Sequence, residues 1–238
     1  MMYGLSDYLK ANPLFLCFLI AHFLADYQLQ SPKMAELKSQ RPDYLLKHIG
    51  FVGITLLPIL IIFPSSWLAN VIIVISHALI DGNKAKIANY LTLNKSQSFL
   101  LDQALHLLII FGISLSSSPL TIPNWLSREM LTAILFLVLI TKPSNIIFKI
   151  LFEKYQPEEV VRVDTIAGAG AMIGTLERIV IGVCMIMGQF ASIGLVFTAK
   201  SIARYNKISE SPAFAEYYLI GSLFSILSVF LAFWICFC

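Results

Sequence analysis

The chain has 238 residues, of which 58% are hydrophobic and 13% are charged, and its mean hydropathy is +0.78. Soluble domains carry about 25% charged residues, so this composition excludes an ordinary soluble protein and indicates an integral membrane protein. The net charge of +3 comes without a basic stripe interleaved with aromatic residues, so we expect no nucleic-acid binding.

Apolar runs separated by polar or proline-containing breaks predict an all-α, polytopic helical bundle. A helix needs about 20 apolar residues to cross a membrane, and runs of roughly this length recur along the chain. We predict eight transmembrane helices, over residues 13–30, 46–63, 66–82, 98–117, 129–149, 166–187, 189–205 and 213–236. The first four would form one half, residues 1–118, and the last four a second half, residues 119–238.

The distribution of Lys and Arg predicts an orientation for these helices. Thirteen of them lie in or beside the loops that follow the odd-numbered helices, whereas only Lys10 and Arg128 lie on the opposite side. Because cytoplasmic loops are enriched in Lys and Arg, both termini should face outside and the longer loops should face the cytoplasm. The remaining cations, Lys142 and Arg178, fall inside predicted spans.

Three predicted helices carry a histidine and an aspartate four residues apart. The pairs are His22–Asp26, His77–Asp81 and Asp102–His106. Residues at this spacing share one face of a helix. The order is reversed in the third pair, whose helix runs in the opposite direction, so each histidine lies deeper and each aspartate lies nearer the cytoplasm. His48 begins the second span at the same level.

The spacing of these residues also indicates an internal repeat. His22 and His77 are 55 residues apart, as are Asp26 and Asp81, and His48 and Asp102 are 54 apart. The first two helices would therefore be duplicated in the next two, as a tandem repeat of helical hairpins. Such a repeat would bring the polar faces of four helices together inside one bundle.

Two interpretations of the cluster remain. A single His–Asp pair is typical of a hydrogen bond that holds two helices together. Three pairs together with His48 favour a metal site, because buried carboxylates without a cation would be poorly compensated at low dielectric. Imidazole and carboxylate suit a divalent transition metal, zinc or manganese. The predicted ligands are His22, Asp26, His48, His77, Asp81, Asp102 and His106, and Asp26, Asp81 or Asp102 could instead act as a general base.

Other polar residues predict contacts to the metal ligands or to a substrate. Gln30 and Gln103 could orient ligands, and Lys33 and Lys84 could bind an anionic substrate or could only determine the topology. In the second half, four cations exceed two buried anions, which predicts either an anion site or an intramembrane salt-bridge network. These residues are Lys142, Arg178, Lys200 and Arg204, with Glu177 and Glu216.

Several motifs resemble those of a bacterial family known as domain of unknown function 3307. They are "HFLADYQLQSPK", "LLKH", "SHALIDGNK" and "LDQALH", with "GTLERIVI", "FTAKSIARY" and "AEYYLIGSLFS" resembling the second half of its longer members. The first half is also similar to the YdjM-like inner-membrane proteins, described as metal-dependent hydrolases and grouped with zinc phospholipase C. This resemblance implies metal-ligand roles for the same four histidines and three aspartates, in a protein of the bacterial inner membrane.

The sequence therefore predicts a metal-dependent hydrolase embedded in the bilayer, with its site near the cytoplasmic side. Its expected substrate is an anionic or phosphate-containing lipid, held by the lysines or by the cations of the second half. A divalent-cation transporter and a non-catalytic partner protein with a structural metal are the alternatives. A transporter's site is expected near the bilayer midplane, whereas this cluster lies toward one surface.

Overall fold

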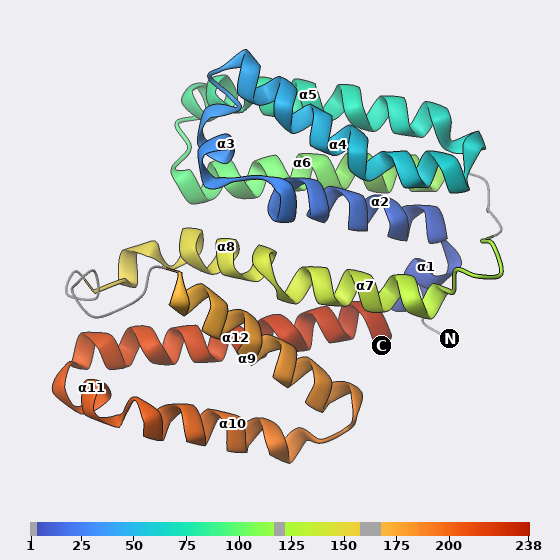
Figure 1. Ribbon diagram of the computed structural model, residues 1–238. Coiled ribbons are helices and arrows are strands. Elements are labelled where there is room, and N and C mark those ends of the chain that lie inside the picture. The colour runs from blue at the N-terminus through green and yellow to red at the C-terminus, as the bar shows by residue number, and fades with distance from the viewer. Residues whose placement is uncertain (1–3, 117–121, 158–167) are drawn as a thin grey trace. The chain divides into compact units, whose positions relative to one another are not determined.

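The computed structural model describes residues 4–116, 122–157 and 168–238, and these ranges contain helices and turns but no strand (Figure 1). The prediction of an all-α protein is confirmed. The chain divides into two compact units, Met1–Val138 and Leu139–Cys238. The division into halves at residue 118 stays a prediction. Each unit is described by itself.

The first unit contains a four-helix bundle made of α2, α4, α5 and α6. Its elements in chain order are α1 (Leu5–Ala11), α2 (Pro13–Phe23), the π-helical segment η1 (Leu24–Leu29), α3 (Pro32–Leu37), α4 (Pro42–Ile62), the 3-10 turn η2 (Pro64–Ser66), α5 (Trp67–Tyr90), α6 (Lys95–Ser116) and α7 (Arg128–Ile140) as far as Val138. Both α2 and α5 pack against α4 and α6, which closes the bundle (Figure 1).

Local sequence explains where several of these helices begin. Pro13, Pro32 and Pro42 each occupy the first turn of a helix, where a missing N–H costs no hydrogen bond. Ahead of α6, the main-chain N–H of Gln97 donates to the Asn94 side chain at 2.9 Å, and the N–H of Asn94 donates to the Gln97 side chain at 3.0 Å. This reciprocal pair is a capping box, which fixes the start of the helix that carries Asp102 and His106.

The first predicted span differs from a straight helix. The axis bends by 102° between α1 and the segment Pro13–Leu29. After Phe23 the chain continues as η1, a π-helical segment that holds Asp26. The side chain of Gln30 donates to the main-chain carbonyl of Asp26 at 3.0 Å, at the end of this segment. Such π-helical turns are rare and frequently occur at functional sites.

The second unit is built around α9 and α12. Its elements are the end of α7 (Arg128–Ile140), α8 (Lys142–Leu151), the 3-10 turn η3 (Glu153–Tyr155), α9 (Ala169–Ile186), α10 (Phe190–Ala203), α11 (Tyr205–Glu210) and α12 (Pro212–Phe237). The central pair α9 and α12 packs together, α8 packs on both, and α10 packs on α9. The predicted helix over 166–187 begins outside the described residues.

Six described segments are long and apolar enough to cross a membrane, which is compatible with a membrane protein. They are Pro42–Ile62, Pro64–Tyr90, Lys95–Ser116, Arg128–Leu151, Ala169–Ile186 and Pro212–Phe237, and the bent pair at the N-terminus would make a seventh. The predicted helix over 189–205 is shorter, because α10 ends at Ala203 after 14 residues. Eight spans and the tandem repeat therefore stay predictions.

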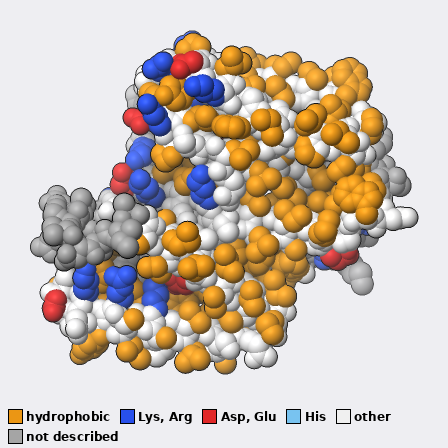
Figure 2. Space-filling model, viewed as in Figure 1, with side chains coloured by type: hydrophobic (Ala, Val, Ile, Leu, Met, Phe, Trp, Pro, Cys, Tyr) orange, Lys and Arg blue, Asp and Glu red, His pale blue; other side chains and the backbone are white. Residues whose placement is uncertain are grey.

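Charged and hydrophobic side chains gather in different places on the face that Figure 2 shows. In the first unit, Figure 2 shows Lys and Arg gathered near α3 and the start of α4, while hydrophobic side chains cover the flanks of the long helices. Among the exposed hydrophobic residues of α4 and α5 are Leu57, Ile61 and Leu79. A helix with apolar residues on its outer face is typical of contact with lipid.

Candidate metal centre

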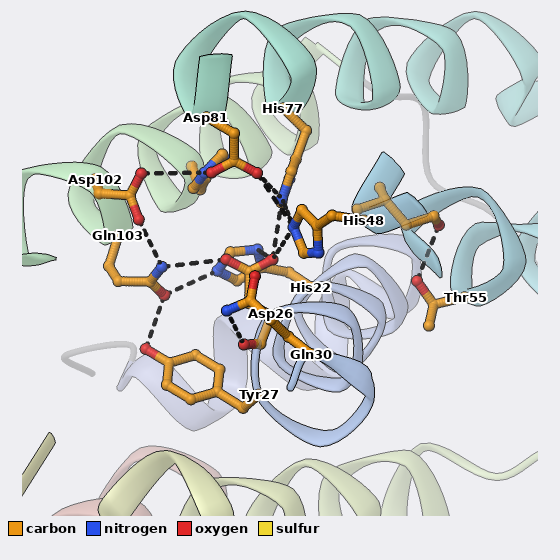
Figure 3. Close-up of polar contacts among 12 residues, drawn as sticks. His22, Asp26, Tyr27, Gln30, His48, Thr55, His77, Asp81, Asp102 and Gln103 are labelled. Atoms are coloured by element: carbon orange, nitrogen blue, oxygen red, sulfur yellow. Dashed lines mark hydrogen bonds and ion pairs between the residues drawn. The ribbon is translucent and has the colours of Figure 1, made fainter. Parts of the chain in front are cut away.

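All seven predicted ligands come together inside the first unit (Figure 3). They are carried by α2, η1, α4, α5 and α6, and none is more than 5% exposed. Three groups of side chains place ligand atoms within 4.8 Å of one another: His22–Asp26–His77, His48–His77–Asp81 and Asp26–Asp102–His106. Every predicted ligand belongs to at least one group, so the cluster could hold a metal ion.

Four atoms form the tightest part of the cluster. They are Nε2 of His48, Nε2 of His77, Oδ1 of Asp26 and Oδ2 of Asp81. The two nitrogens are 3.1 Å apart. His48 Nε2 lies 3.4 Å from the Asp26 oxygen and 3.1 Å from the Asp81 oxygen. His77 Nε2 lies 3.0 Å and 3.4 Å from the same two atoms. Five of the six separations among these atoms thus fall between 3.0 and 3.4 Å.

These separations match the edges of a tetrahedral metal site. Zinc binds imidazole nitrogen and carboxylate oxygen at about 2.0–2.1 Å, and a regular tetrahedron with such bonds has edges of about 3.3–3.4 Å. Two imidazoles and two carboxylates are also ligand types that zinc accepts. Both the chemistry and the spacing of the four atoms therefore fit one tetrahedrally bound ion. We call His48, His77, Asp26 and Asp81 the inner set.

The other oxygens of the two inner carboxylates have partners of their own. Oδ1 of Asp81 forms an ion pair with the Lys38 ammonium at 2.8 Å, and Oδ2 of Asp26 lies 4.0 Å from the same nitrogen. Oδ2 of Asp26 also accepts a hydrogen bond from Gln103 Nε2 at 3.2 Å. The Tyr27 hydroxyl donates to the Gln103 carbonyl oxygen at 2.8 Å, which fixes the orientation of that amide (Figure 3). Such contacts hold metal-binding carboxylates in place.

Lys38 is a residue of the cluster that the sequence did not predict. It was expected only to mark a cytoplasmic loop, but its side chain is 2% exposed and lies in the cluster. Burial alone would lower the pKa of Lys38, but the carboxylates of Asp26 and Asp81 raise it above its usual value, so the ammonium stays charged. The premise that the carboxylates lack any protein cation was therefore wrong. Met34, buried four residues earlier, was the available signal that Lys38 turns inward.

His22, His106 and Asp102 surround the inner set at longer distances. Nε2 of His106 lies 3.6 Å from Oδ1 of Asp81 and 3.8 Å from Oδ1 of Asp102. Asp102 accepts a bond from Lys84 at 2.9 Å through its other oxygen. Nδ1 of His22 lies 3.9 Å from Asp26, and its Nε2 faces Gln103 at 3.3 Å. That all seven residues bind metal stays a prediction.

Two of the expected second-half cations have protein partners in the second unit. Arg178 donates to the carbonyls of Ile140 and Thr141 at 2.6 and 3.3 Å, and to the Asn145 side chain at 2.6 Å. Lys200 donates to Glu177 at 2.7 Å and to Ser222 at 3.1 Å. The Lys200–Glu177 ion pair agrees with the salt-bridge alternative, whereas these hydrogen bonds of Arg178 go to neutral oxygens. The anion site stays a prediction.

The other predicted substrate-binding cations lie near the surface. Lys33 is exposed, and its ammonium lies 5.9 Å from the centre of the Tyr44 ring. Lys142 is half-buried at the start of α8, and Arg204 is half-buried at the end of α10. Arg204 and Lys207 line one open pocket of the second unit.

Fold and site together define a helical protein with membrane-length apolar helices and a buried His/Asp cluster that could hold a metal ion. Residues 14–143 match a family model described as "Protein of unknown function (DUF3307)". Because this match covers more than half of the chain, the chain belongs to that family. The matched region contains the whole cluster, and the residues after 143 lie outside it. No curated protein and no solved structure matches the chain.

Proposed function

We propose that this chain is a membrane-embedded, metal-dependent hydrolase whose ion is bound by the inner set. The observation that supports this most strongly is the set of five separations of 3.0–3.4 Å among nitrogen and oxygen atoms of His48, His77, Asp26 and Asp81. The Lys38 ammonium lies 3.2 Å from His48 Nε2, but without a bound ion the two inner oxygens and the two Nε2 atoms would still be mostly acceptors that face one another in a buried space, which is unfavourable.

The ligand set favours zinc over manganese. Two nitrogens and two oxygens in a tetrahedral arrangement are typical of zinc, whereas manganese prefers six ligands that are mostly oxygen. The two carboxylates would balance the charge of a divalent ion. When bound, such an ion lowers the pKa of a coordinated water and polarises a phosphoryl or acyl oxygen.

Asp102 is the residue that we assign as general base. Its Oδ2 is held by Lys84 and by Gln103 at 2.9 and 3.3 Å, while among the described residues its Oδ1 has no hydrogen-bond partner. In the proposed step Asp102 takes a proton from water, and the water oxygen forms a bond to phosphorus or to an acyl carbon. The ester bond breaks, and its oxygen leaves with the proton that Asp102 returns to it.

A small pocket gives water a place beside this carboxylate. It lies between α5 and α6 and is lined by Lys84, Asp102, Ile80, Leu101 and Leu105, among others. Its volume of about 10 Å³ is roughly the space that one water molecule needs. The proposed substrate class is an anionic or phosphate-containing lipid in the bacterial inner membrane, and the Lys84 ammonium beside Asp102 is the cation that we assign to its anionic group.

A structural metal is the second candidate, and one observation favours it. The inner set supplies four protein ligands, and closed sites of this kind usually stabilise a fold, whereas catalytic zinc keeps one position open. On this reading the ion would fasten η1 to α4 and α5 without chemistry, and the chain would act as a non-catalytic membrane partner.

Metal analysis and a hydrolysis assay on the full chain separate these possibilities. The protein is purified in detergent, its zinc content is measured, and phosphate release from a phosphatidate-containing vesicle is followed before and after chelation. We expect bound zinc, zinc-dependent hydrolysis, and loss of hydrolysis with retained zinc in Asp102→Asn. Zinc without hydrolysis would favour the structural role, zinc uptake into vesicles would favour a transporter, and a metal-free protein would refute the metal site.

A further inference from the structure

We propose that the Lys38 ammonium serves as a built-in second cation, so that the cluster binds one metal ion where its ligands could otherwise hold two. This inference rests on the metal site of the proposed function and specifies the number of ions in it. The two oxygens of each inner carboxylate contact different groups.

In Asp26 and in Asp81, one carboxylate oxygen belongs to the inner set and the other oxygen, which we call the outer oxygen, faces the Lys38 ammonium. Asp26 Oδ1 and Asp81 Oδ2 face the two Nε2 atoms at 3.0–3.4 Å. Asp81 Oδ1 faces Lys38 at 2.8 Å, and Asp26 Oδ2 lies 4.0 Å from the same nitrogen. This ammonium also lies 3.2 Å from His48 Nε2, but its carboxylate contacts are to the outer oxygens. Lys38 therefore neutralises the outer oxygens and leaves the inner oxygens free to bind an ion.

Ligands for a second ion are present on this outer side. Asp26, Asp102 and His106 place ligand atoms within 4.8 Å of one another, and Asp81 Oδ1 lies 3.6 Å from His106 Nε2. His106 Nε2 and Asp102 Oδ1 are buried and have no hydrogen-bond partner among the residues that the structure describes. These carboxylates could bridge two ions, as in two-metal enzymes whose ions lie about 3.5–4 Å apart.

The ammonium of Lys38 prevents that second ion from binding. It forms an ion pair with Asp81 Oδ1, which a second ion would need as a bridging ligand. A single lysine positive charge beside one divalent ion then supplies the electrostatic stabilisation that a second ion gives in two-metal sites.

The test is the zinc stoichiometry of the full chain in detergent, measured after metal removal and titration with zinc. We expect one zinc ion per wild-type chain and two per chain in Lys38→Met, which keeps the length of the side chain but removes its charge. Lys38→Arg keeps a positive charge and should bind one. Lys33→Met, a change of an exposed lysine on α3, the helix that ends just before Lys38, is the matched control and should also bind one.

A double variant identifies where the second ion binds. In Lys38→Met combined with His106→Ala the count should return to one, because His106 belongs to the outer ligands only. In the otherwise native chain, His106→Ala should retain one ion and His77→Ala should lose it, which tests the assignment even where Lys38→Met does not fold. Two ions in the wild-type chain, or one in folded Lys38→Met, would overturn the inference while leaving the metal site intact. A wild-type chain without zinc would overturn both.

Discussion

The imidazoles of His48 and His77 point at each other with their Nε2 atoms 3.1 Å apart, although they belong to α4 and α5 and are 29 positions apart in the chain. At this distance one nitrogen can donate a proton to the other, but each also faces carboxylate oxygens of Asp26 and Asp81. A bound divalent ion satisfies all four atoms at once, which a single shared proton cannot do.

Removing one inner ligand should therefore remove the ion. We expect His77→Ala and Asp81→Asn each to reduce zinc content from about one ion per chain to a small fraction, measured by elemental analysis after gel filtration. Their unfolding temperatures should no longer rise when zinc is added, because binding to the folded chain is linked to stability. Asp43→Asn is the control, since this exposed aspartate pairs only with Arg41 in the described structure. Normal zinc content in His77→Ala would contradict the inner set.

Gln103 should control affinity without being a ligand. It donates to the outer oxygen of Asp26 and accepts from Tyr27, so it fixes the direction of that carboxylate. We expect Gln103→Leu to weaken zinc binding roughly 10–100-fold, the usual effect of losing such a supporting contact. Tyr27→Phe should have a smaller effect in the same direction, because the amide remains. Competition with a chelator of known affinity measures both, and an unchanged affinity in Gln103→Leu would exclude this role.

Arg178 should matter for stability rather than for metal binding. Its guanidinium donates to two main-chain carbonyls where α7 meets α8, and Arg178→Met would leave both without that donor. We expect a loss of about 1–3 kcal/mol for each carbonyl left unsatisfied, seen as a lower unfolding temperature at unchanged zinc content. Binding to anionic vesicles need not change in this variant.

Arg204→Gln is the matched change at a half-buried arginine of the same unit. If the second unit binds anionic lipid, this variant should bind phosphatidate vesicles more weakly at an unchanged unfolding temperature. Equal vesicle binding by Arg204→Gln and the wild-type chain would count against the anion site.

The orientation in the membrane can be tested by chemical labelling. Gln40 lies between α3 and α4, and Ser65 lies in the turn between α4 and α5, so the two should face opposite sides. In a variant with Cys238 changed to Ser, we expect Ser65→Cys to react with a membrane-impermeant thiol reagent in intact cells. Gln40→Cys should react only after the cells are opened. The reverse pattern would invert the proposed topology.

The sequence identified the helical class and the His and Asp residues that lie together in the structure. Its success has a local cause, because a four-residue spacing places His77 beside Asp81 on α5 whatever the rest of the chain does. Apolar length likewise predicts membrane-length helices from each segment alone. The predicted helix over 189–205 runs two residues past Ala203, where α10 ends and the polar residues that lead into α11 begin.

Tertiary structure decided which atoms meet. Oδ1 of Asp26 lies closer to His77 than to His22, its partner in sequence, at 3.0 and 3.9 Å. This aspartate belongs to a π-helical segment, whose turn is wider than that of an α-helix, so four-residue spacing no longer describes its direction.

Lys38 shows the same limit more clearly. Its local sequence is polar and typical of a loop, and only the packing of α3 against α4 shows that its ammonium reaches Asp81. The sequence alone predicted which His and Asp residues share a helix face, because the four-residue spacing is a local property of each helix. Their division between an inner set and an outer set depends on contacts between helices far apart in the chain, and only the folded bundle specifies those contacts.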